Sequence, residues 1–145
     1  MLEGYELAKD ILKQVNALLA RKGLLLKRGS IVDATIIAAP SSIKNAEGTR
    51  DPDMHQTKKG EQWYFGMKTH IGVDADSGLV HTVTTTAANE ADVEQVADLL
   101  HGKEKQVWAD SGYRGVCAAV LPRYHIDYSI KRSLGSKLGA LKKVA

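Results

Sequence analysis

The chain has little that points to a secreted or membrane protein. Only one of its 145 residues is a cysteine, Cys117, so an internal disulfide is excluded and a reducing compartment is expected. The first residues lack the basic and apolar segments of a signal peptide, and no apolar run approaches the length that spans a bilayer. These absences predict a cytoplasmic protein with no membrane segment, in which Cys117 is a small core residue rather than a nucleophile.

Acidic residues are missing from the last part of the chain. Residues 131–145 carry five Lys or Arg and no Asp or Glu, whereas residues 1–30 have a net charge of +3 and residues 31–130 a net charge of −5. We therefore divide the chain into an N-terminal helix and lead-in (1–30), a core (31–130) and a basic tail (131–145). An acidic centre between basic ends suits a carboxylate metal site beside surfaces that meet phosphate, although charge alone is more typical of a solvated surface.

Hydrophobic periodicity predicts an alternation of strands and helices. Helices are expected at residues 5–22, ended by Gly23, and after Asn89, which is a good N-cap; the second ends at Gly102. A third is expected at residues 115–123. Strands are expected at residues 24–26, 31–37, 63–74, 79–86, 106–110 and 126–130, and residues 40–60 are interpreted as a long loop. This order predicts an α/β fold, a mixed sheet with flanking helices.

Two aspartates lie within or at the end of apolar, strand-like runs. Asp33 lies inside IVDATII (31–37), and Asp110 ends QVWAD (106–110). A carboxylate in a buried apolar run costs free energy unless something pairs with it, and Mg²⁺ is commonly held by one or two carboxylates plus substrate phosphates. Each aspartate also has a simpler explanation, since Asp110 is a good turn starter before Ser-Gly and Asp33 fits a solvated strand face.

Five motifs, taken together and in this order, resemble those of bacterial DDE transposases, in particular the insertion-sequence-five family. They are VDATI (32–36), DMHQTKKG (53–60), WYFGMKTHIGVD (63–74), TAANEAD (86–92) and ADSGY (109–113), and the resemblance runs from about residue 11 to residue 130. It implies a ribonuclease-H-like core at residues 31–130, in which the first and fourth strands lie side by side. It also implies that Asp33 and Asp110 are the first two members of an Asp-Asp-Glu triad.

In such enzymes the triad binds two Mg²⁺ or Mn²⁺ ions, and the substrate is double-stranded DNA at the element ends and at the target. The third carboxylate has no counterpart here, because no Asp or Glu follows Ile130 and the glutamates before Asp110 fall on the wrong elements. We therefore expect a sheet truncated before its last helix, in a transposase fragment that is inactive alone. Its expected protein partner is a second copy or a full-length transposase.

Several cations are candidate DNA contacts. Lys68 and His70 share one face of the strand at residues 63–74, which suits phosphate binding but is equally typical of an exposed strand face. Lys58 and Lys59 in the expected loop, and Arg114 after the second aspartate, are further candidates, although surface lysines and arginines are common. Three functions stay open at this point: a transposase, a non-catalytic DNA- or transposase-binding fragment, and a metal-dependent nuclease whose third ligand comes from water or another subunit.

Overall fold

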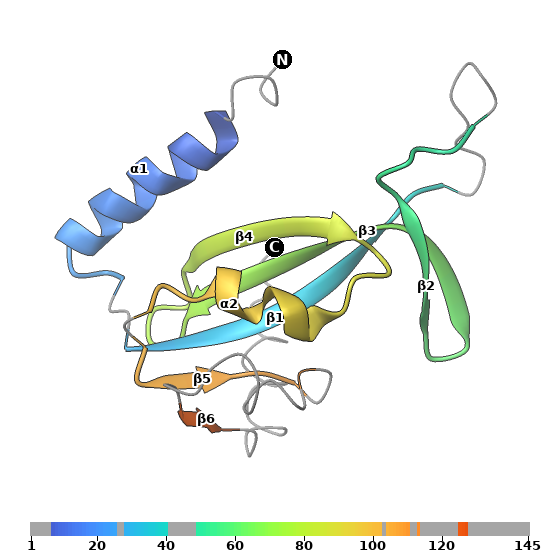
Figure 1. Cartoon of the computed structure of the whole chain (residues 1–145). Helices are drawn as coiled ribbons and strands as arrows, with labels where there is room; N and C mark the ends of the chain where they lie inside the picture. Colours follow the sequence, from blue (N-terminus) through green and yellow to red (C-terminus); the bar gives the residue numbers. More distant parts are fainter. Residues whose placement is uncertain are drawn as a thin grey trace.

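A computed structural model gives the fold of the chain (Figure 1), and it describes residues 7–25, 28–40, 49–102, 104–110, 113 and, for the backbone, 125–127. Six strands form one sheet in the order β2-β3-β1-β5-β6, and β4 pairs with β3. Their bounds are β1 Gly29–Ala38, β2 His55–Lys59, β3 Gln62–Asp74, β4 Val80–Ala87, β5 Gln106–Trp108 and β6 His125–Asp127. The sheet mixes antiparallel and parallel pairs, so the predicted α/β fold with a mixed sheet is confirmed.

The antiparallel part of the sheet is built around β3. This strand pairs with β1 from Ser30↔Asp74 to Ala38↔Gly66, and with β4 along most of the same length. Its alternating sequence places two glycines where neighbours approach closely. A Cβ on Gly66 would overlap the backbone of Ile37, and one on Gly72 would overlap the carbonyl oxygen of Leu99. Glycine at these positions lets β1, and the helical segment over the sheet, pack directly against β3.

The parallel part joins β1 to β5 and β5 to β6. Gly29 pairs with Gln106 and Ile31 with Trp108, so the first strand and the strand at residues 106–108 are neighbours, as the resemblance implied. One edge of β1 is paired with β3, and the other edge is paired with β5. Because β5 ends at Trp108, this second edge has no strand beside it beyond Ile31 in the described part of the chain.

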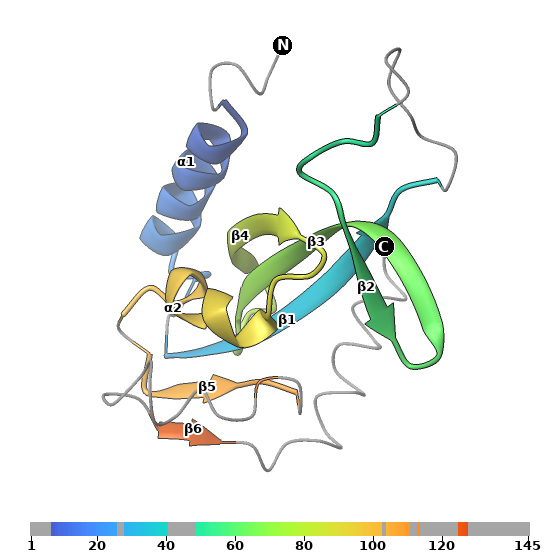
Figure 2. The ribbon, with the colours of Figure 1, turned by 45° about the vertical axis from the view of Figure 1, so that its right-hand side comes forward.

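The core lies between the sheet and a short helical segment. This segment is the 3-10 helix η2 (Asp92–Gln95) followed by one turn of α-helix, α2 (Val96–Leu99), and Figures 1 and 2 both show it over β1 and β3. The buried cluster consists of Val32, Val96, Leu99, Val107 and Tyr113. Burying an aliphatic side chain of this size stabilises the fold by about 1.5–3 kcal/mol, so these few residues fix where the segment lies on the sheet.

Helix α1 (Leu7–Arg21) forms as expected, but its apolar face is not covered by the described part of the chain. None of its residues is buried, and its apolar stripe of Leu7, Ile11, Val15 and Leu18 is exposed. Figure 2 shows α1 standing beside β4, and the amide of Asn16 donates a hydrogen bond to the carbonyl oxygen of His81 at 2.7 Å. None of the described helices is long and apolar enough to cross a bilayer.

Four local predictions are wrong. No strand forms at Leu24 or Leu25, and β2 (His55–Lys59) lies within the expected loop at residues 40–60. Asn89 does not cap a helix, because it lies in a turn closed by the hydrogen bond from the Glu90 amide to the Ala87 carbonyl oxygen. The helix that follows begins at Asp92 and is far shorter than expected. The expected helix at residues 115–123, the basic tail and Cys117 lie outside the described residues.

Candidate functional site

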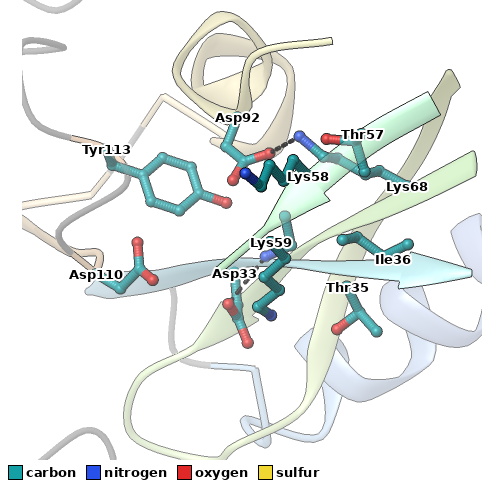
Figure 3. A pocket seen from close by; sticks show the side chains of 11 residues that line it. Asp33, Thr35, Ile36, Thr57, Lys58, Lys59, Lys68, Asp92, Asp110 and Tyr113 are labelled. Carbon is teal, nitrogen blue, oxygen red and sulfur yellow. Dashed lines mark hydrogen bonds and ion pairs between the residues drawn. The ribbon is translucent and has the colours of Figure 1, made fainter. Parts of the chain in front are cut away.

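Asp33 and Asp110 line the same pocket, a hollow of about 410 Å³ beside the free edge of β1 (Figure 3). The register explains why they meet. Ile31 and Trp108 are the last paired residues of β1 and β5, and each aspartate lies two positions farther along its own segment. Asp33 is half-buried and its Oδ1 accepts a hydrogen bond from the Ala34 amide at 2.9 Å, while Asp110 is exposed just beyond β5.

Tyr113 forms one wall of this pocket and is almost wholly buried. In Figure 3 its hydroxyl extends into the pocket near Asp92. The pKa of Tyr113 is raised far above its ordinary value of 10.0, first by burial and then by the negative charges of Asp92, Asp33 and Asp110. The hydroxyl therefore stays protonated at neutral pH, and three carboxylates lie close enough to act on it.

Asp92, the first residue of η2, is a site residue that the sequence analysis did not single out. Its Oδ1 lies 2.8 Å from Nζ of Lys68, which also donates to the Glu90 carbonyl oxygen at 2.7 Å. The two side chains are mostly buried, with exposed fractions of 13% for Lys68 and 28% for Asp92. The signal in the sequence was the motif TAANEAD, whose last residue is Asp92.

His70 shares a strand face with Lys68 but does not reach the pocket. Its ring is wholly buried, and Nε2 lies 2.8 Å from the hydroxyl oxygen of Thr86. The pKa of His70 is lowered below its ordinary value of 6.5, chiefly by burial; Asp92 opposes this shift and Lys68 adds to it. A neutral, buried imidazole has no exposed surface on which to make the expected contact with DNA.

Lys58 and Lys59 lie on strand β2, where a loop was expected, and together with Thr57 they line the pocket. The strand is held by its pairing with β3, from His55↔Gly66 to Lys59↔Gln62. A two-residue turn joins the strands, with Gly60 at a φ of 64°. The hairpin thus brings two lysines to a pocket that also contains carboxylates (Figure 3). Arg114, the remaining predicted DNA contact, lies outside the described residues.

The pocket has oxygen ligands suited to a hard divalent cation. Asp33 and Asp110 supply two carboxylates on adjacent segments, which is the number that commonly holds Mg²⁺ when substrate phosphates complete its coordination. Among the described residues, no group of three or more His, Cys, Asp or Glu side chains is placed to hold a metal ion. The described side chains therefore fit a cation that takes part of its coordination from water or phosphate.

Residues 25–141 match the family model described as "Transposase DDE domain". This span includes every strand of the sheet and all residues that line the pocket. No solved structure matches the chain.

Proposed function

Because the chain belongs to the transposase DDE domain family, we propose that its pocket is the site of metal-dependent DNA strand cleavage and transfer. The observation that carries the proposal is the placement of Asp33 and Asp110 at the ends of paired segments of β1 and β5, in one pocket with three lysines. Paired carboxylates need cations at neutral pH, and lysines beside them suit a phosphodiester substrate.

In this proposal Asp33 and Asp110 hold the divalent cations, Mg²⁺ or Mn²⁺. When bound, such ions activate an attacking oxygen and stabilise the leaving oxygen of an in-line phosphoryl displacement. Lys58 and Lys59 contact the phosphates of the strand that enters the pocket. Tyr113 keeps its proton and offers a hydrogen-bond donor beside the carboxylates. No protein nucleophile is required, because water and then a DNA 3′ hydroxyl make the attacks.

We propose further that the chain is of the insertion-sequence-five type and acts on double-stranded DNA at element ends and targets, as part of an oligomer. The sequence motifs support this finer assignment. A second candidate function is DNA or transposase binding without cleavage. It is favoured by the fact that the described residues bring two carboxylates, not a three-residue cluster, to a metal position.

The test is titration calorimetry of Mn²⁺ into the wild-type chain and into Asp33→Asn, Asp110→Asn and Asp98→Asn, combined with nicking of supercoiled plasmid DNA. Asp98 is an exposed carboxylate of α2 that does not line the pocket, so it is the matched control. The proposal is supported if Asp33→Asn and Asp110→Asn lose Mn²⁺ binding and Mn²⁺-dependent nicking while Asp98→Asn keeps both. Salt-sensitive DNA binding without nicking supports the second candidate, and no Mn²⁺ binding by the folded wild-type chain contradicts the metal site.

A further inference from the structure

The hairpin of β2 and β3 carries an exposed aromatic side chain with cations around it. Trp63 is 64% exposed, the largest fraction among the exposed large apolar side chains of the described residues. Nζ of Lys58, its cross-strand partner, lies 5.9 Å from the centroid of the indole ring. The ring of Trp63 therefore lies open to solvent, with a cation near it, and is accessible for stacking.

The same face of β3 repeats this arrangement two residues farther on. Phe65 follows Trp63 at the strand period of two, and the guanidinium of Arg50 lies 4.7 Å from the centroid of the phenyl ring. Residues two apart on a strand are about 6.8 Å apart. The hairpin face therefore presents two aromatic rings in a row, each with a cation beside it.

This face projects beyond the rest of the sheet. β2 pairs only with residues 62–66 of β3, whereas β1 and β4 pair with the stretch from Gly66 onward, so the end of the hairpin is a two-stranded ribbon. Figures 1 and 2 show it curving away from β4. Lys58 connects the hairpin face to the carboxylate pocket, because it lines the pocket and its Nζ lies over the ring of Trp63.

We propose that the β2–β3 hairpin is a stacking platform for unpaired nucleotides of the DNA strand that enters the pocket. Trp63 stacks on a base, while Lys58 and Arg50 contact the flanking phosphates. Aromatic rings interleaved with cations bind single-stranded nucleic acid without sequence preference, since every base has a π face and every linkage a negative charge. The pocket's role in DNA binding is taken from the proposed function above, and the platform extends that surface through Lys58.

The positive charge of the hairpin face favours a nucleic acid strand over a second copy of the chain as the bound partner. Trp63 and Phe65 have a lysine and an arginine over their rings, and a polyanion satisfies these cations, whereas a second basic hairpin would repel them. A protein partner would make the hairpin an oligomer contact, and that outcome is distinguishable by its effect on sedimentation.

The experiment compares wild type, Trp63→Ala, Trp63→Phe and Tyr64→Ala by fluorescence anisotropy, with a labelled oligothymidylate and a duplex of equal length as the probes. Tyr64 is the adjacent aromatic residue, and it lies on the opposite face of the same strand. We expect Trp63→Ala to weaken single-strand binding by roughly 5- to 150-fold, the range measured for loss of one stacked base. Trp63→Phe should keep part of the affinity, and Tyr64→Ala should keep nearly all of it.

Because Trp63 is uncharged, the salt dependence of binding should be the same in Trp63→Ala and wild type, and duplex binding should change little. Equal losses in Trp63→Ala and Tyr64→Ala, or an unchanged affinity for the oligothymidylate, would overturn the platform. A fall in sedimentation coefficient in Trp63→Ala with unchanged DNA affinity would also overturn it, in favour of a subunit contact. Mn²⁺ binding at Asp33 and Asp110 is measured separately, so failure of the platform is distinguishable from failure of the proposed function.

Discussion

Lys68 of β3 and Asp92 of η2 are joined at 2.8 Å across the boundary between the sheet and the helical segment above it. Both residues line the pocket, and Lys68 also donates a hydrogen bond to the Glu90 carbonyl oxygen in the turn before η2. The pair therefore fixes the start of η2 and, in the same place, sets the charge beside Tyr113. It is at once a structural contact and part of the candidate site.

Replacing Asp92 by Asn should lower the free energy of unfolding by about 1–2 kcal/mol, because the mostly buried ammonium of Lys68 loses its counter-charge while an amide oxygen remains to accept its hydrogen bond. Urea unfolding measures this change. Glu94→Asn, at an exposed carboxylate on the same 3-10 helix, is the control and should stay within about 0.5 kcal/mol of wild type. If the two variants unfold alike, the ion pair does not stabilise the start of η2.

His70 should make the stability of the fold fall in mild acid. Its pKa in the folded chain is below the 6.5 of the unfolded chain, so below pH 6.5 the unfolded state binds a proton that the folded state excludes. Stability from this residue is present above pH 6.5 and is lost as the pH falls below it. In urea unfolding as a function of pH, His70→Gln should show a shallower loss than wild type. His55→Gln, at an exposed histidine, should follow the wild-type curve.

The class of fold could be predicted because it depends on strong signals, whereas the meeting of Asp33 with Asp110 was expected from the family resemblance, which implied that the first and fourth strands are neighbours. The alternation in β3 and the apolar runs of β1 and β5 are local patterns, and the order of the elements restricts how they pair. Strand β2 could not be found in this way. Its sequence HQTKK is polar on both faces, and its pairing comes from the turn at Gly60 rather than from burial.

Lys68 and His70 show a second limit of sequence patterns, which predict the face of a strand on which a side chain lies but not whether it is exposed. Their spacing places both on one strand face, which is correct, but their accessibility depends on what lies above that face. Lys68 borders the pocket, whereas the ring of His70 is covered and bonded to Thr86. Asp92 was overlooked for the same reason, since its value to the site comes from a tertiary contact with Lys68.

Glu104 should be a determinant of stability at the other end of β1. Its side chain is wholly buried, and Oε1 accepts hydrogen bonds from the Ser30 hydroxyl at 3.1 Å and the His101 amide at 2.7 Å. Glu104→Ala leaves those donors without their acceptor and should lower the free energy of unfolding by about 2–4 kcal/mol. Glu104→Gln keeps an acceptor and should cost less. Urea unfolding of both variants measures the difference, and equal losses would show that the negative charge of Glu104 matters rather than its acceptor oxygen.

The lysines of β2 should contribute charge, and not sequence preference, to DNA binding. Lys58 and Lys59 line the pocket, and each phosphate that a protein neutralises adds about 0.9 to the magnitude of the slope of log K against log salt for duplex DNA. The variant Lys58→Gln/Lys59→Gln should therefore reduce that slope by about 1–2 and weaken binding to unrelated duplexes equally. Anisotropy titrations at several salt concentrations measure both quantities. Lys105→Gln, next to the opposite end of β5, is the matched control and should leave the slope unchanged. An equal reduction of the slope in both variants would show that DNA binding depends on the overall charge of the chain rather than on contacts in this pocket.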